Sequence, residues 1–297
     1  MKTWSAMLLI MRPANIITAI ADILAGIAIA GFFAPEILNQ QIVFQIILLS
    51  IATAGLYGGG IVFNDVFDLY LDKINRPERV IPSGRLSLNK AKTLGIVLFL
   101  LGIIAAFCIS IFSGFIAITT MICALMYDKY GKHHTFLGPI NMGLCRGLNL
   151  ILGMSINPEL DPKYFLIAIL PVIFVSAITL TAQKETKGKN KLAIGLAMVL
   201  DACIVVGFWI ISQHFNFSIK NTFIFLLLWY AVNAISKLNA IVNNSPKLIM
   251  KAVKIGVLSL IPLNASYVAG FSSVYIAILV LCLLPISLFL SKKFPVT

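Results

Sequence analysis

The chain has 297 residues, of which 60% are hydrophobic and 11% charged, with a mean hydropathy of +0.98 and a net charge of +12 at pH 7. Soluble domains carry about 25% charged residues, so this composition excludes a water-soluble enzyme. The basic excess does not indicate nucleic-acid binding, because the positive residues gather in particular loops between apolar runs, as they do in membrane proteins.

Runs of about twenty apolar residues recur along the chain, which is the length that crosses a bilayer as a helix. They predict an all-α, polytopic membrane protein with nine to ten transmembrane helices, and residues 1–297 should form a single integral membrane domain. The expected spans are 8–33, 42–63, 93–112, 114–127, 139–156, 164–182, 192–212, 222–243, 249–268 and 271–291.

The distribution of basic residues predicts the topology. If the N-terminus is cytoplasmic, the termini and the loops after even-numbered spans hold nearly all of the 23 Lys and Arg residues, and only Lys163 and Lys220 fall on the opposite side. Positive charge is retained on the cytoplasmic side of membranes. We therefore expect the loops at 64–92, 127–138 and 183–191 to be cytoplasmic, in what we take to be the bacterial inner (plasma) membrane.

Three acidic residues, Asp65, Asp68 and Asp72, stand where the second span should leave the lipid. At about 100° per residue they fall within roughly 60° on one helical face, where like charges repel unless a cation holds them. Carboxylates at this spacing suit Mg²⁺, which completes its shell with water and substrate phosphates. The alternative is a solvated acidic helix end, but a run of basic residues follows, as an anion site would require.

The residues around these aspartates follow the spacing N-D-x-x-D-x-x-x-D-x-x-N-x-P-x-R-x-x-P-S-G-R, from Asn64 to Arg85. This segment resembles the first aspartate motif of the UbiA superfamily of intramembrane prenyltransferases. The resemblance implies helices around a central cavity, cytoplasmic helical cap loops, and transfer of a prenyl group from an isoprenoid diphosphate. It also implies Mg²⁺ on Asp65, Asp68 and Asp72 as catalytic metal ligands, with Asn64 at the substrate.

The segment after the aspartates is basic and rigid. Pro77 ends the helix, and Pro82 and Gly84 predict a structured turn. A solvated basic loop would explain the charge but not the two prolines and the glycine. We favour a lid in which the guanidinium groups of Arg79 and Arg85 fold back over a diphosphate.

The resemblance extends to other substrate contacts. Proteins of this kind carry an Arg-Pro pair and a polar residue early in the first helix, which here implies Asn15. They also carry a tyrosine and a basic residue after the fourth helix, which implies Tyr127 for binding and Lys129 for catalysis. Asn141 is a further candidate for the wall of the site.

Arg146, on the turns next to Asn141, needs an anionic or carbonyl partner because it lies inside an apolar run. A contact with substrate and a structural ion pair with Asp22 or Asp201 are equally compatible with the sequence.

The resemblance also implies a second acidic motif after the sixth span, but this chain has only Glu185 there, among lysines that include Lys187. These lysines would neutralise phosphate directly as point charges, and Glu185 and Lys187 are therefore predicted to bind substrate. This segment, together with Gly138 to Arg146, is similar to the divergent UbiA-like proteins called EboC.

The predicted function is Mg²⁺-dependent transfer of a prenyl group to a small-molecule acceptor, aromatic or lipid-like, by ionisation of the allylic diphosphate. No Ser-His or Cys-His arrangement suggests a nucleophilic enzyme. The alternative is a non-catalytic or transport-type relative that binds a lipid diphosphate or a secondary metabolite, since intramembrane charges also occur in transporters.

Overall fold

The computed structural model describes residues 3–34, 36–183 and 190–294, and every regular element in this part of the chain is helical. The elements are α1 (Thr3–Met11), α2 (Pro13–Ile29), α3 (Gln40–Phe67), α4 (Leu69–Asn75), α5 (Leu88–Phe107), α6 (Ile111–Lys129), the 3-10 turn η1 (Gly131–His133), α7 (Leu137–Met154), η2 (Pro162–Ala168), α8 (Ile169–Ala182), α9 (Lys191–His214), α10 (Ile219–Asn243), α11 (Pro246–Leu258), α12 (Leu260–Phe271), α13 (Val274–Leu281) and α14 (Leu283–Lys293).

Within the described residues, eight helices are long and apolar enough to cross a membrane, and the bent pair of α1 and α2 gives a ninth. The 18-residue helix α7 is a further member of the bundle, more polar because it carries Arg146 and Asn149. Side chains such as Leu100, Phe115 and Leu227 are exposed on the outside of the bundle, where lipid would cover them. The predicted all-α fold and the approximate helix count are confirmed.

The first predicted span is broken near its start. Pro13 cannot donate a backbone hydrogen bond, and α1 meets α2 at an angle of 52°. Arg12, at the break, has a φ of 49°, a left-handed conformation that is costly for a residue with a Cβ. This conformation separates the two helices and places the side chain of Arg12 beside the end of α3.

Other helix ends also differ from the predicted ones. The second span continues to Phe67, so that Asn64 and Asp65 are still helical. Helix α6 begins at Ile111, where Ser110 accepts a hydrogen bond from the backbone of Ser113 at 3.0 Å. Hydropathy does not detect such a serine inside a long apolar stretch.

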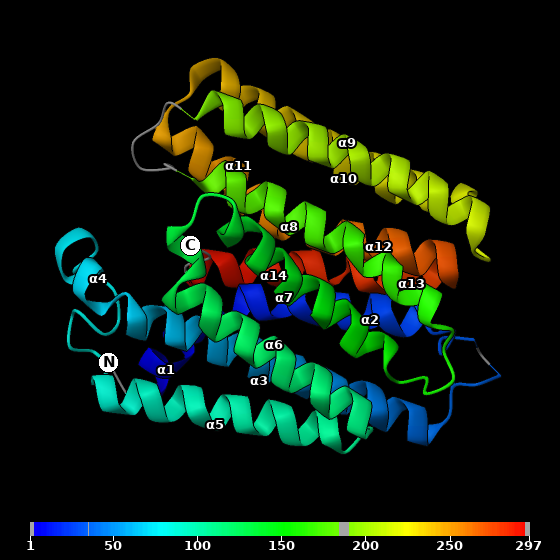
Figure 1. The fold of residues 1–297 in the computed structure, drawn as a ribbon, viewed down its shortest axis with the longest axis horizontal. Helices are drawn as coiled ribbons and strands as arrows, with labels where there is room; N and C mark the ends of the chain where they lie inside the picture. The colour runs from blue at the N-terminus through cyan, green and yellow to red at the C-terminus, as the bar shows by residue number, and fades with distance from the viewer. Residues whose placement is uncertain (1–2, 35, 184–189, 295–297) are drawn as a thin grey trace.

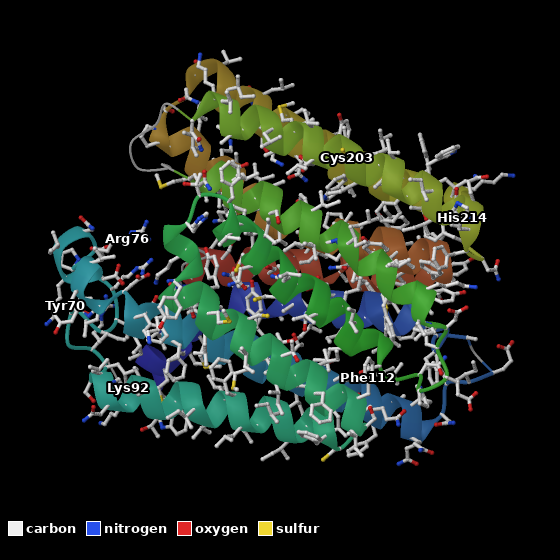
Figure 2. All side chains as sticks on the ribbon, in the orientation of Figure 1. Tyr70, Arg76, Lys92, Phe112, Cys203 and His214 are labelled. Atoms are coloured by element: carbon white, nitrogen blue, oxygen red, sulfur yellow. The ribbon has the colours of Figure 1, made fainter. Side chains whose placement is uncertain are left out.

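The loops with the motif residues lie at one end of the bundle. Figure 1 shows α4 and α1 there, on the left. In Figure 2, Tyr70, Arg76 and Lys92 are at this end, whereas Phe112 and His214 are at the other. The loop that joins α4 to α5 and the turn η1 therefore share one face of the protein, as the distribution of basic residues predicts.

The central helices approach closely at small residues. A Cβ added to Gly26 of α2 would lie 2.4 Å from the backbone oxygen of Leu150 in α7, and one added to Gly153 of α7 would lie 2.5 Å from the oxygen of Ile23. Lipid provides no hydrophobic force between helices, so packing of this kind holds membrane bundles together. The contact fixes α2 against α7 beside the cavity described next.

Candidate functional site

A cavity of about 270 Å³ lies among the central helices. Its lining residues are Arg12, Asn15, Thr53, Leu56, Tyr57, Gly60, Ile61, Asn64, Thr120, Ala124, Tyr127, Asp128, Met142, Cys145, Asn149, Ile178, Thr179, Ala182, Val253 and Val257. The ends of α3 and α6 that point toward α4 supply Asn64, Tyr127 and Asp128, and the break before α2 supplies Arg12. The cavity is therefore charged at the end near α4 and mainly apolar elsewhere.

Two of the motif aspartates share basic partners. Asp65 Oδ1 accepts a hydrogen bond from Arg12 Nη2 at 2.8 Å, and it also lies 3.4 Å from Arg79 Nη1. The same Nη1 donates to Asp72 Oδ2 at 2.8 Å. Both carboxylates are 5% exposed, so these pairs lie outside bulk solvent. One cationic nitrogen thus stands between two carboxylates from different helices.

The third aspartate binds a lysine that sequence reasoning did not select. Lys132 Nζ lies 2.5 Å from Asp68 Oδ1. Lys129, the predicted catalytic lysine, is exposed and lies over the ring of Tyr130, 5.0 Å from its centroid. Helix α6 ends at Lys129 and the chain then turns through η1, and this turn returns Lys132 to the aspartates.

The predicted lid is a structured loop, but its two arginines bind different partners. Val80, Ile81 and Leu86 are buried against α1 and α3, and Gly84 has a φ of +75°. Arg79 reaches the aspartates. Arg85 instead bonds to Ser83 Oγ at 2.9 Å and to the backbone oxygen of Glu78, within its own loop, and is exposed.

Of the other predicted contacts, some line the cavity and one does not. Asn15, Asn64 and Tyr127 line the cavity. Asn141 does not; its amide bonds to the backbone oxygen of Cys123 and the backbone nitrogen of Tyr127, each at 3.1 Å, and so joins α7 to α6. Asn64 Nδ2 donates to Asp128 Oδ1 at 2.8 Å. No sequence pattern singles out Asp128, because a carboxylate at a helix end usually faces water.

Arg146 is held in a polar network rather than at the cavity surface. Its Nη1 lies 2.6 Å from Asp22 Oδ2, and its Nη2 donates to Thr18 Oγ1 and Tyr57 OH, each at 2.8 Å. The side chain is 2% exposed. Asp22 also accepts from the amides of Asn149 and Asn264, whose nitrogens are 3.0 Å and 2.6 Å away. Of the two readings of Arg146, this geometry matches the structural pair with Asp22.

The second intramembrane acid is paired as well. Asp201 Oδ2 lies 2.5 Å from Lys237 Nζ, which joins α9 to α10 away from the cavity. The predicted contacts Glu185 and Lys187 lie outside the described residues. Just before that segment, Gln183 donates to the backbone oxygen of Thr135 at 2.7 Å, which brings the end of α8 beside the loop after η1.

The aspartate set fits a magnesium ion by its chemistry. Among the described residues, no three His, Cys, Asp or Glu side chains already surround one point. Asp65 and Asp72 nevertheless face a common positive charge, because both lie within 3.4 Å of Arg79 Nη1. Carboxylate oxygens are preferred ligands of Mg²⁺. An ion at this place would displace the guanidinium groups from the carboxylates.

Comparison with known proteins identifies the family. The model of the UbiA prenyltransferase family matches residues 19–198, which include the aspartate motif, Lys132 and Arg146. The chain belongs to the UbiA prenyltransferase family. Together with the apolar helices, this membership makes it an integral membrane protein.

Two curated relatives are digeranylgeranylglyceryl phosphate synthases. The one from Sulfurisphaera tokodaii is 29% identical over 174 residues, 59% of this chain and 60% of that protein. The one from Saccharolobus solfataricus is 35% identical over 157 residues, 52% of this chain and 54% of that protein. The matched regions thus span between half and two thirds of these relatives.

The fold is shared with solved UbiA-type structures over nearly the whole chain. A structure of a digeranylgeranylglyceryl phosphate synthase superposes with a TM-score of 0.69 at 20% identity, covering 91% of this chain and 99% of that one. A UbiA homologue from Archaeoglobus fulgidus bound to DMAPP and Mg²⁺ superposes with a TM-score of 0.65 at 16% identity, covering 88% of this chain and 98% of that one. At these identities the likeness establishes the fold alone.

Proposed function

We propose that this UbiA-family protein is an intramembrane prenyltransferase, which transfers a prenyl group from an isoprenoid diphosphate to a lipid-like or aromatic acceptor with Mg²⁺ as cofactor. The observation that carries the proposal is the cavity itself, an apolar chamber between membrane helices with three aspartates and three basic side chains near one end. The names of the curated relatives favour a lipid-like acceptor over an aromatic one.

The charged end of the cavity suits a diphosphate. Asp65, Asp68 and Asp72 would hold Mg²⁺, which when bound supplies positive charge to the departing diphosphate. Arg79 and Lys132 now neutralise these carboxylates. With a cation held by the carboxylates, Arg79 and Lys132 would be free to donate charge-assisted hydrogen bonds to phosphate oxygens.

The apolar part of the cavity suits the prenyl chain. Three helices line it, with Leu56 and Ile61 from α3, Ile178 from α8, and Val253 and Val257 from α11. This wall would bury the chain and keep water from the allylic carbon while the acceptor attacks. Preorganised positive charge in a water-poor chamber stabilises the leaving diphosphate more than solvent would.

The decisive experiment measures transfer and binding with the purified full chain in detergent. We expect a labelled isoprenoid diphosphate to bind and to be transferred only when Mg²⁺ is present. Lys132→Ala and Arg79→Ala should each weaken binding roughly ten- to a hundredfold, because each removes a charge-assisted contact of about 1.5–3 kcal/mol. Their matched controls, Lys129→Ala and Arg85→Ala, should change binding much less. Equal losses in both pairs would contradict the assignment of these side chains.

The alternative of a transport-type or non-catalytic protein gains no support from the intramembrane charges. Asp22 and Asp201 are each paired with a basic residue and buried, and neither lines the cavity. A transport pathway needs ionisable groups that face a water-filled route. Mg²⁺-dependent binding of the diphosphate without any turnover, with all tested acceptors, would restore this alternative.

We further propose that the end with α4 faces the cytoplasm. Arg76 and Lys92 lie there (Figure 2), whereas Glu159 and Asp161 are exposed in the segment that joins α7 to η2. Basic residues are retained on the cytoplasmic side. The organisms of the curated relatives are archaea, so the comparisons do not support the expected bacterial membrane.

A further inference from the structure

Helix α4 carries an exposed apolar stripe that the proposed prenyl transfer does not use. Tyr70 and Ile74 are 82% and 80% exposed, and Leu71 beside them is exposed as well. Phe67, the last residue of α3, is exposed and begins the stripe. Large apolar side chains gathered in this way on a surface mark a contact with a partner or with a membrane.

The stripe lies on the side of the helix opposite the motif aspartates. The backbone nitrogen of Asp68 donates to the oxygen of Asn64 at 3.0 Å, and its own backbone oxygen accepts from Asp72 at 2.8 Å, so the helical spacing continues from α3 into α4. At about 100° per residue, the stripe is centred roughly 150° away from Asp65, Asp68 and Asp72. Helix α4 therefore turns its carboxylates toward their basic partners and its apolar side chains outward.

The stripe continues the surface of the bundle that lipid covers. The ring of Phe67 lies 6.1 Å from the ring of Phe63, and Phe63 stacks on Phe99 of α5 with 5.6 Å between ring centroids. The exposed side chains of α5, such as Ile96 and Leu100, belong to the membrane-facing outside of the bundle. The apolar stripe thus prolongs the α3 and α5 side of the protein beyond the transmembrane segment.

Exposed lysines accompany the stripe. Lys73 of α4 places its Nζ 5.9 Å from the centroid of the Tyr70 ring, and Lys90 and Lys92 are exposed in the first turns of α5. Figure 2 shows Tyr70 and Lys92 at the same end of the bundle. Apolar residues, a tyrosine and lysines on one short helix are typical of segments that lie in the interface of an anionic membrane. Lysine reaches the headgroups while its methylene chain stays on apolar surface.

We propose that α4 lies in the membrane interface and binds anionic lipid headgroups, with Leu71 and Ile74 at the outer ends of the acyl chains and Lys73 at the phosphates. The partner is the bilayer surface on the side of the motif loops. This contact would hold Asp68 and Asp72 at the depth of the headgroups. It does not depend on prenyl transfer, so either proposal can fail without the other.

The test measures the depth of α4 in vesicles of phosphatidylcholine and phosphatidylglycerol. The full chain without native cysteines carries the fluorophore NBD on Ile74→Cys, and Leu71→Cys repeats the measurement on the same stripe. The quenchers are lipids with a spin label near the headgroup end of the acyl chain, and iodide in the water. The controls are Glu78→Cys, exposed in the loop after α4, and Leu100→Cys on the outside of α5. All four positions are exposed, so these substitutions preserve the packing.

We expect the spin-labelled lipids to quench the probe at Ile74 about threefold or more beyond the probe at Glu78, and iodide to show the reverse order. The probe at Leu100 should be quenched by lipid and shielded from iodide.

The charge of the lipid should matter as well. At equal membrane composition, spin-labelled phosphatidylglycerol should quench the probe at Ile74 about twofold more than spin-labelled phosphatidylcholine, because basic side chains gather anionic lipids around them. Replacing Lys73, Lys90 and Lys92 with glutamine should remove most of this difference without moving the probe out of the interface.

Two results would overturn the inference. If iodide quenches the probe at Ile74 as strongly as the probe at Glu78 in every vesicle composition, α4 faces water and its stripe is left for a soluble protein partner. Equal quenching by the two labelled lipids, with all three lysines present, would refute the binding of anionic headgroups.

Discussion

The network around Arg146 allows a quantitative prediction, because it separates a structural role from a role in substrate binding. Asp22→Leu removes the carboxylate that accepts from Arg146, Asn149 and Asn264. Arg146→Leu removes the cation that faces this carboxylate. Each single substitution leaves a buried charge without its partner, and such a loss costs about 3–5 kcal/mol.

The double variant should be more stable than the sum of its parts. Without both charges, Asn149 still donates to the backbone oxygen of Ala19 and accepts from Thr53. The amide of Asn264 loses its carboxylate partner, and the hydroxyl of Tyr57, at the cavity wall, loses the guanidinium. One unsatisfied buried amide costs about 1–3 kcal/mol. Additive single effects would give about 6–10 kcal/mol, so we expect a favourable coupling of several kcal/mol between Asp22 and Arg146.

The assay is unfolding by SDS in mixed micelles, followed by far-UV circular dichroism, for the parent, both single variants and the double variant. Isoprenoid diphosphate binding is measured in the same preparations. The double variant should bind nearly as well as the parent, because Arg146 bonds to Asp22, Thr18 and Tyr57 and does not line the cavity. Additive stability losses would refute the ion pair. A folded double variant that no longer binds the isoprenoid diphosphate would show that Arg146 contributes to substrate binding.

Further variants test the packing, the metal and the topology. Gly26→Ala should destabilise the protein by about 1–3 kcal/mol in the same SDS assay, because its Cβ would lie 2.4 Å from a backbone oxygen. Gly195→Ala should leave the stability unchanged, because no atom lies within 4 Å of the added Cβ. Equal effects of the two substitutions would argue against the close helix contact. Asp65→Asn should remove the Mg²⁺ dependence of isoprenoid diphosphate binding, measured by titration with and without EDTA, and an unchanged Mg²⁺ response would place the metal elsewhere. Cysteines introduced at Asn75 and Glu159, in a background without native cysteines, should react with a membrane-impermeant maleimide from opposite sides of the membrane, and labelling from one side would refute the topology.

Several features of this protein follow from the sequence by itself. The composition and the apolar runs determine a helical membrane protein, because only segments of about twenty apolar residues satisfy their backbone groups inside a bilayer. The segment from Asn64 to Arg85 determines the family, since its residues and their spacing are local properties of one helix end and one loop. The positions of lysine and arginine predict that the motif loops share one side, and the structure brings the described loops to one end of the bundle.

Only the tertiary structure decided which charges meet. Arg146 and Asp22 are 124 residues apart. An arginine inside an apolar run predicts that a polar or acidic partner exists, but the sequence does not show which residue that partner is. The choice between Lys129 and Lys132 depends on how the chain turns through η1 after α6. Asp128 meets its partner Asn64, 64 residues away, only because α3 and α6 pack together. Hydropathy and motif spacing are local quantities, whereas these pairings depend on how distant helices pack side by side.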